Sequence, residues 1–137
     1  MDAHRARTLF ANERIARLAT AAASGAPHLV PVTFAMLDEQ IVIAIDHKPK
    51  TTMNLRRLRN IRENPKVSLL VDHYEDDWTR LWWARADGNA AIHDDGTERE
   101  AAIRALSTKY EQYRQHTPEG PVIVTTVDRW SGWAYSE

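Results

Sequence analysis

The strongest constraint on the fold is a series of short segments in which apolar and polar residues alternate before a turn interrupts them. In residues 14–22, Ala16 and Leu18 fall on one side of an extended chain, while Ile15 and Arg17 fall on the other. Side chains alternate in this way along a β-strand, because successive Cβ atoms point to opposite faces. The chain is therefore expected to be rich in strands.

Six strands and three short helices are predicted from this periodicity and from the turn residues between the segments. The predicted strands span residues 14–22, 28–37, 40–46, 66–74, 81–93 and 121–135, and the predicted helices span residues 2–12, 54–64 and 97–115. This order predicts a mainly β, mostly antiparallel barrel or sheet with short helices. The length fits a single domain over residues 1–137.

Local signals refine these predictions. Pro31 cannot donate a hydrogen bond to a ladder, so the strand around it is expected at a sheet edge or at a bulge. A later strand is expected to be interrupted near Asp87-Gly88. Asp2 is the predicted N-cap of the first helix, and Thr97 with Glu100 fits a capping box for the last helix.

The composition limits the classes of partner. The 18 basic and 19 acidic residues give a net charge of −1, whereas a protein that holds long nucleic acid by charge carries a basic excess. The absence of cysteine excludes disulfides and thiolate metal sites and suits a reducing cytoplasm. The six histidines lack the spacing that pairs metal ligands on one helix face, so no metal site is expected.

No membrane association is expected either. The longest uncharged run, from Leu18 to Leu37, contains Pro27 and Pro31 in its interior, which argues against a transmembrane helix. The N-terminal residues mix charges from the second position and offer no apolar segment of a secretory signal. We therefore expect a cytoplasmic protein.

One stretch of the chain departs from the overall charge balance. Residues 47–66 hold seven Lys or Arg against one acid, Glu63. Lys48 and Lys50 follow a predicted strand and precede a predicted helix, so their side chains and the N–H groups of the helix N-terminus converge. Such a junction suits a phosphate. The alternative is that the arginines beyond it form the solvated face of an amphipathic helix.

The order of motifs along the chain resembles that of a known family. The segment ERIARLATAAASGAPHLVPVTFAML (13–37) is followed by HKPKTT (47–52), NLRRLRNIRENPKVSLLVD (54–72) and RLWWARADGNAAI (80–92). This series resembles the split β-barrel flavin and deazaflavin oxidoreductases, the pyridoxamine 5′-phosphate oxidase-like family. Within that family it is most similar to the branch that uses coenzyme F420, a deazaflavin with a phosphodiester and a tail of several carboxylates.

The resemblance implies an FMN-binding-like split barrel that works as a homodimer, with the cofactor at the interface between two copies. The residues implied to lie along or beside the cofactor ring are Pro31, Val32, Thr33, Ala44, Ile45 and His47. The residues that match the family's phosphate-binding motif are Lys48, Lys50 and Thr51. Arg57 and its neighbouring arginines are expected to meet the anionic tail of F420.

The chain also departs from the oxidases that give the family its name. It has a longer helix between Lys50 and Asn64-Pro65, and it lacks their pyridoxal-phosphate-binding C-terminal pattern. The resemblance therefore does not imply oxidation of pyridoxamine phosphate.

The five tryptophans are a second group of candidate site residues. Trp82 and Trp83 must point to opposite faces of one strand, so one of them is expected to face a cleft or a partner. The resemblance implies that a second copy completes the cofactor pocket, and Trp78, Trp83 and the RWSGW segment (129–133) are the candidates for that role. Packing in the core or in a dimer interface is the alternative for each tryptophan.

The implied function is an oxidoreductase that transfers a hydride from reduced F420 to an electron-poor small molecule such as an enone or a quinone. No Ser-His-Asp set, activated cysteine or carboxylate pair stands out, which fits chemistry that belongs to a cofactor, so no catalytic residue is assigned. The alternatives are an FMN-dependent oxidoreductase and a carrier or sensor that binds a cofactor or haem without catalysis. A nucleic-acid-binding module is the least favoured, because of the net charge.

Overall fold

The computed structural model describes residues 1–45 and 55–136, and in these residues one antiparallel sheet has seven strands. The strands are β1 (Ala16–Ala21), β2 (Pro27–Val32), β3 (Ala35–Leu37), β4 (Gln40–Ala44), β5 (Lys66–His73), β6 (Trp82–His93) and β7 (Val122–Ala134). The helices are α1 (Ala3–Ala11), α2 (Arg56–Glu63), α3 (Thr97–Lys109) and α4 (Glu111–Gln115), with a short 3-10 helix η2 (Trp78–Arg80). The predicted mainly β, antiparallel fold with short helices is confirmed.

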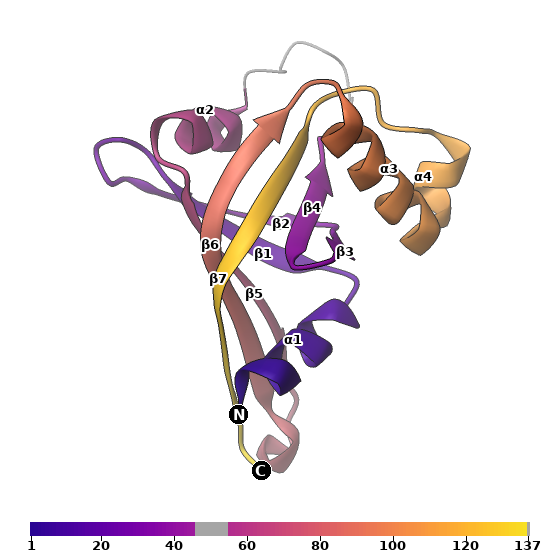
Figure 1. Cartoon of the computed structure of the whole chain (residues 1–137). Coiled ribbons are helices and arrows are strands. Elements are labelled where there is room, and N and C mark those ends of the chain that lie inside the picture. Colours follow the sequence, from indigo (N-terminus) through magenta and orange to yellow (C-terminus); the bar gives the residue numbers. More distant parts are fainter. Residues whose placement is uncertain (46–54, 137) are drawn as a thin grey trace.

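The sheet curls into a split barrel because its two edge strands are consecutive in the chain. The strand order is β2-β1-β5-β6-β7-β4-β3, so β2 and β3 lie at opposite edges. Only Thr33 and Phe34 join them, and three Cα-to-Cα steps reach no more than about 11 Å. The two edges therefore come close together. Figure 1 shows this curl, with β6 and β7 running the length of the molecule.

Two predicted elements are each divided in the structure. The strand expected over residues 28–37 is two strands, β2 and β3, because the chain leaves one sheet edge at Thr33 and joins the other. The helix expected over residues 97–115 is two helices, because Tyr110 has extended backbone angles (φ −120°, ψ 123°) between α3 and α4.

Three of the local signals describe the structure correctly. The Asp2 carboxylate accepts the N–H of Arg5 at 2.8 Å and caps α1. The strand that holds Pro31 is an edge strand, and the register of β6 against β7 shifts between Asp87 and Gly88. At this shift the backbones come so close that a Cβ at position 88 would collide with the carbonyl oxygen of Thr126, so glycine is required.

The predicted capping box at the start of α3 is wrong. The N-cap is Gly96, with φ of 94°, and Thr97 is already the first helical residue. The Thr97 hydroxyl lies 3.3 Å from a carboxylate oxygen of Glu98 instead. Gly96 takes the N-cap position because glycine adopts this left-handed backbone conformation without a Cβ penalty.

Apolar side chains that alternate inward along the strands fill the barrel interior. Leu18, Ile43 and Leu69 are buried there, and Phe10 of α1 and Leu58 of α2 belong to the same cluster. The alternation that predicted the strands is therefore the alternation between the barrel interior and its outside.

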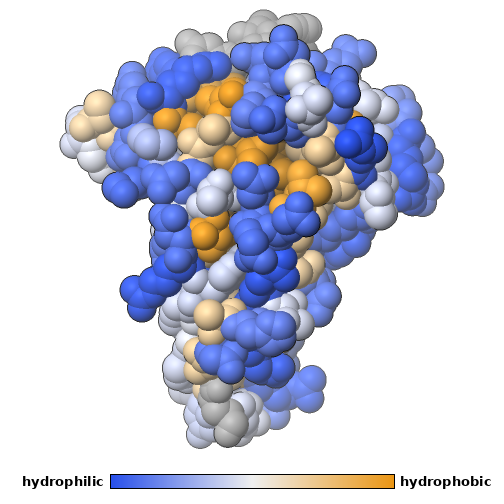
Figure 2. Space-filling model, in the orientation of Figure 1, coloured by the Kyte–Doolittle hydropathy of each residue, from blue (hydrophilic) through white to orange (hydrophobic). Residues whose placement is uncertain are grey.

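A second apolar cluster lies under α3, outside the barrel. Val42 and Ala44 of β4 pack there with Leu106 of α3 and Val124 of β7. Because Ile43 points into the barrel, β4 is buried on both faces. Figure 2 shows the charged and polar surface of α2 and α3, with apolar surface gathered between the two helices.

The Tyr110 hydroxyl fastens α3 and α4 to the crossing between the sheet edges. It lies within hydrogen-bond distance of the carbonyl oxygens of Arg14 (2.7 Å) and Phe34 (2.9 Å), and it accepts the N–H of Phe34 at 3.1 Å. Burial raises the pKa of this hydroxyl. One side chain thus satisfies the backbone at the point where the chain changes edges.

We expect Tyr110→Phe to destabilise the fold. The substitution leaves the buried Phe34 N–H without its acceptor and removes the one O–H that the carbonyl oxygens of Arg14 and Phe34 share, which costs roughly 1–3 kcal/mol of unfolding free energy. Urea unfolding followed by circular dichroism measures this, with the exposed Tyr135→Phe as the control. Equal unfolding midpoints for the two variants would show that the hydroxyl does not hold the crossing.

Lys109 is expected to make the unfolding free energy of the protein depend on pH. Its Nζ donates to the carbonyl oxygen of Glu13 at 2.7 Å and lies 3.8 Å from the Phe34 ring centroid. Burial, with a smaller contribution from the charge of Arg14, lowers the pKa of Lys109 from 10.5 to about 8. Above that pKa the unfolded chain binds more protons than the folded chain, so this group adds stability as pH rises toward its ordinary pKa.

We therefore expect the unfolding free energy of the parent, relative to that of Lys109→Met, to rise between about pH 7 and about pH 9.5. Chemical unfolding of both proteins at several pH values measures the difference. A difference that does not change with pH would mean that the Phe34 ring attracts the ammonium enough to offset its loss of water.

Candidate functional site

The outward side of five neighbouring strands forms a surface that we call the outer face. Its side chains alternate with those of the barrel core, and the two sets are separated by the pleat of the sheet. The residues of the outer face are Leu29 and Pro31 of β2, Arg17 and Ala19 of β1, Ser68, Leu70 and Asp72 of β5, Trp83 and Arg85 of β6, and Ser131 and Trp133 of β7.

Strand register brings two of the predicted site residues onto this face. Pro31 pairs with Arg17, Arg17 with Leu70, and Leu70 with Arg85, which makes one row across the sheet. Trp83 lies two residues before Arg85 on the same strand and so on the same face. Pro31 and Trp83, 52 positions apart in the sequence, therefore share one surface.

A cavity of about 670 Å³ lies on the outer face at the ends of β5, β6 and β7. Trp83 and Trp133 line it together with Leu70 and Arg85, while Trp82, on the other side of the strand, packs against the barrel core. The Arg85 guanidinium lies over the Trp83 ring, 5.3 Å from its centroid. The volume and the aromatic lining fit a planar ring of the size of a cofactor.

The outer face is more apolar than an exposed sheet surface normally is. Leu29 is 67% exposed and Trp133 is 44% exposed. Charged pairs lie on the strands between these two apolar side chains: Arg17 lies 3.6 Å from Asp72, and Arg85 lies 3.2 Å from Asp87. Exposed large apolar side chains on one sheet face are typical of a surface that binds a ligand or another protein.

Charged side chains also lie beside the cavity, at the end of β5. Glu75 accepts hydrogen bonds from His73 and from Arg80, the latter at 3.0 Å. These contacts lower the pKa of Glu75, with the His73 hydrogen bond as the largest cause. His73 is therefore already paired with Glu75.

Arg57 is one of two arginines whose buried Nε has no hydrogen-bond partner among the described residues; the other is Arg7, whose Nε lies 3.7 Å from a carboxylate oxygen of Glu39. Arg57 is half-buried on α2. Burial lowers the pKa of this guanidinium. The next turn of α2 is anchored, since the buried Asn60 donates to Thr20 of β1 at 3.0 Å. A buried N–H of a cation without an acceptor is a candidate contact for an anionic ligand.

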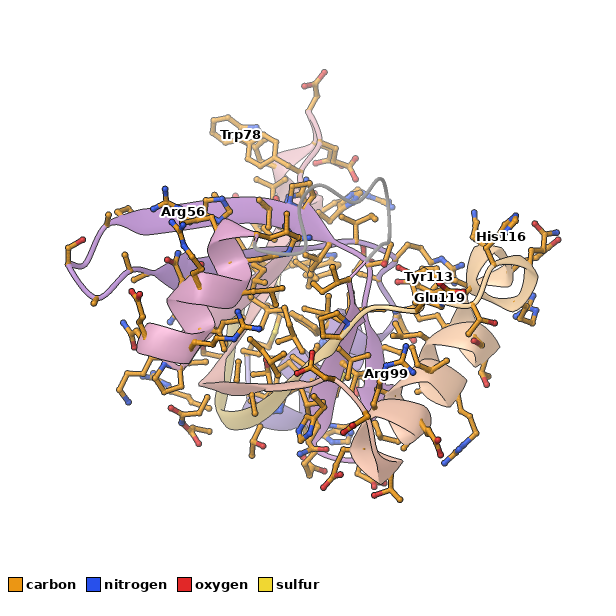
Figure 3. The ribbon with its side chains drawn as sticks, turned by 90° about the horizontal axis from the view of Figure 1, so that it is seen from above. Arg56, Trp78, Arg99, Tyr113, His116 and Glu119 are labelled. Atoms are coloured by element: carbon orange, nitrogen blue, oxygen red, sulfur yellow. The ribbon has the colours of Figure 1, made fainter. Side chains whose placement is uncertain are left out.

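The other arginines of α2 differ from Arg57. Arg56, Arg59 and Arg62 are exposed, and Figure 3 shows Arg56 on the outside of the helix. The sequence interpretation of a solvated helix face thus describes these three residues.

The remaining predicted ring residues fall into two groups. Val32, Ala44 and Ile45 are buried in the two cores, so only their backbone groups are able to face a ligand. Thr33 is half-buried, and its hydroxyl lies 2.7 Å from that of Tyr113 on α4. Tyr113 was not predicted, because it is 80 positions from Thr33 and carries no sequence signal of its own.

Trp78 and the basic segment complete the set of predicted residues. Trp78 is 61% exposed on η2, and in Figure 3 it projects beyond the outline of the barrel. The predicted residues His47, Lys48, Lys50 and Thr51 lie outside the described residues.

No metal centre or membrane span is found in residues 1–45 and 55–136. Their His, Asp and Glu side chains form no group of three or more that would hold a metal ion. None of their helices is long and apolar enough to cross a membrane.

Comparison with solved structures shows the same fold in other proteins. A FAD-binding protein from Mesorhizobium loti matches with a TM-score of 0.75 and 20% identity over 96% of this chain and 94% of its own. The conserved hypothetical protein Rv2991 from Mycobacterium tuberculosis matches with a TM-score of 0.79 and 19% identity, over 98% and 86%. The heme storage protein HutZ from Vibrio cholerae matches with a TM-score of 0.72 and 18% identity, over 98% and 95%.

Comparison of sequences identifies the family. No curated protein matches this chain. The family model described as pyridoxamine 5′-phosphate oxidase matches residues 3–134, which is nearly the whole sequence. The split barrel and the family match agree, and the chain belongs to the pyridoxamine 5′-phosphate oxidase family.

Proposed function

We propose that the protein binds coenzyme F420 and uses the reduced cofactor to transfer a hydride to an electron-poor small molecule. The observation that carries this proposal is Arg57, a half-buried guanidinium with a buried Nε that lacks an acceptor among the described residues. It is the second residue of α2, five positions after the end of the basic segment of residues 47–52. Membership of a family that includes oxidoreductases supports the reaction class.

The charge of F420 fits this end of the molecule better than the charge of FMN. FMN has one phosphate, which Lys48, Lys50 and Thr51 are sufficient to bind. F420 has in addition a tail with several carboxylates, and a carboxylate is a good acceptor for the Nε–H of Arg57. Leu55, the N-cap of α2, has no polar side chain to compete for the N–H groups of the first turn.

The outer face supplies a surface for the ring of the cofactor. When bound, a reduced deazaflavin supplies a hydride from its C5 atom. The chain's own role is to hold the ring, to exclude water and to orient the acceptor. A second copy of the chain, packed on the outer face, would cover the exposed Trp133 and Leu29 and place aromatic side chains such as Trp78 or Trp83 against the site.

Arg57→Ala tests the assignment of the tail. We expect it to weaken F420 binding about tenfold, because one charge-assisted hydrogen bond is lost, and to leave FMN binding unchanged. Fluorescence titration of the purified protein with each cofactor measures both affinities. Arg62→Ala, an exposed position on the same helix, is the matched control and should bind like the parent. Unchanged F420 affinity in Arg57→Ala would contradict the assignment.

Lys50→Ala tests the phosphate site separately. Both cofactors carry a phosphate group, so we expect this substitution to weaken F420 and FMN alike, by about tenfold or more. The same titrations measure it. If Lys50→Ala binds both cofactors like the parent, the phosphate lies elsewhere. Tight FMN binding by the parent without affinity for F420 would reverse the choice of cofactor but keep the reaction class.

A carrier that binds haem or another cofactor without catalysis is the second candidate function. The match to the heme storage protein HutZ favours it, and so does the aromatic cavity of the outer face, which has room for a flat ring. Haem titration followed by absorbance separates the two functions. Haem binding together with no oxidation of reduced F420 by a panel of enones and quinones would favour the carrier.

A further inference from the structure

The structure brings one phenol to the strand that is expected to lie along the cofactor ring. The hydroxyl oxygens of Tyr113 and Thr33 are 2.7 Å apart, and both side chains are half-buried. Thr33 follows Val32 at the end of β2, outside the ladder hydrogen bonds of the strand. The pair therefore lies at the crossing between the sheet edges, and both side chains keep part of their surface exposed.

Tyr113 is held in a fixed position by the elements around it. Its N–H donates to the carbonyl oxygen of Tyr110 at 3.2 Å, and its ring meets the Tyr110 ring edge-on, with centroids 5.7 Å apart. Arg99 of α3 donates to the carbonyl oxygens of Pro118 and Gly120 and fixes the loop that follows α4. Figure 3 shows Tyr113 next to this loop, between α4 and the strands.

Other candidates for a proton donor are less well placed. Tyr74 is 70% exposed at the end of β5, so bulk water surrounds its hydroxyl. His73 is paired with Glu75. Among the described residues, Tyr113 is the phenol that is both half-buried and hydrogen-bonded to a residue expected at the ring.

A proton donor in the protein matters more for the reduction of an enone than for the reduction of a quinone. Hydride addition to the β-carbon of an enone forms a C–H bond and moves the electrons of the C=C bond into an enolate. An enolate is strongly basic and must be protonated at the α-carbon or oxygen. Hydride addition to a quinone gives a hydroquinone anion, which is much less basic and which water protonates readily.

We propose that Tyr113 donates this proton and that Thr33 is its positioning residue. The Tyr113 O–H bond breaks as the proton moves to the enolate, and the Thr33 hydroxyl donates to the phenolate oxygen that forms. Solvent then returns the proton to Tyr113. The inference rests on the proposed function, since the reduced deazaflavin is the source of the hydride, and it names conjugated carbonyl compounds as the substrate class.

The test compares two acceptors in the same protein. Tyr113→Phe should lower kcat for an enone about 100-fold, the scale of a lost general acid, while KM and F420 affinity stay the same. The rate with a quinone should stay within about twofold of the parent rate. Thr33→Val should show the same pattern more weakly, and Thr33→Ser should restore the parent rate. Gln112→Ala, an exposed neighbour on α4, is the matched control.

A solvent deuterium isotope effect on enone reduction by the parent is expected to change in Tyr113→Phe, whereas a purely structural role for Tyr113 would leave it unaltered. Circular dichroism checks that the variants fold, and Thr33→Val provides the same comparison if Tyr113→Phe does not. A parent that oxidises no reduced F420 overturns the proposed function. A parent that reduces quinones but not enones, or a Tyr113→Phe variant that slows both acceptors equally or neither, overturns the proton role alone.

Discussion

The hydrogen bonds of the Tyr110 hydroxyl hold the crossing between β2 and β3, where the chain passes from one edge of the sheet to the other. The chain must pass from one edge of the sheet to the other within two residues, and Phe34 thereby leaves the ladder. A buried backbone without partners is costly, so one phenol supplies the acceptor and donor that the strands do not. The same residue interrupts the last helix and directs Tyr113 toward Thr33.

Barrel closure decides which surfaces are left for function. α1 and α2 pack with the barrel core, and α3 covers β3, β4 and part of β7 from outside. The outer face of β2, β1, β5, β6 and β7 receives no helix in the described residues, although it carries exposed leucine and tryptophan side chains. The uncovered outer face and the buried Nε of Arg57 are two of the features that the described residues leave without a partner, and we propose that a cofactor between two copies of the chain contacts both.

Strand positions were predictable from the sequence because alternation is local, and the pairs Ala16 with Leu18 and Ile15 with Arg17 already separate core from outer face. The division of the expected strand 28–37 at Thr33 was not predictable, because it depends on which edges of the sheet meet in space. The break at Tyr110 depends on hydrogen bonds to Phe34, 76 positions away. The sequence showed that α2 is basic. It did not distinguish the half-buried Arg57 from the exposed Arg56, Arg59 and Arg62, because burial depends on how the helix packs on the sheet.

We propose that the outer face and Arg57 together receive an anionic ring cofactor, and a crystal structure of the protein with bound F420 is the direct test. We expect the deazaflavin ring to lie on the outer face between two copies of the chain. We also expect a phosphate or carboxylate oxygen of the tail within hydrogen-bond distance of Arg57 Nε. F420 bound elsewhere, or bound with Arg57 Nε still lacking an acceptor, would rule out this binding mode.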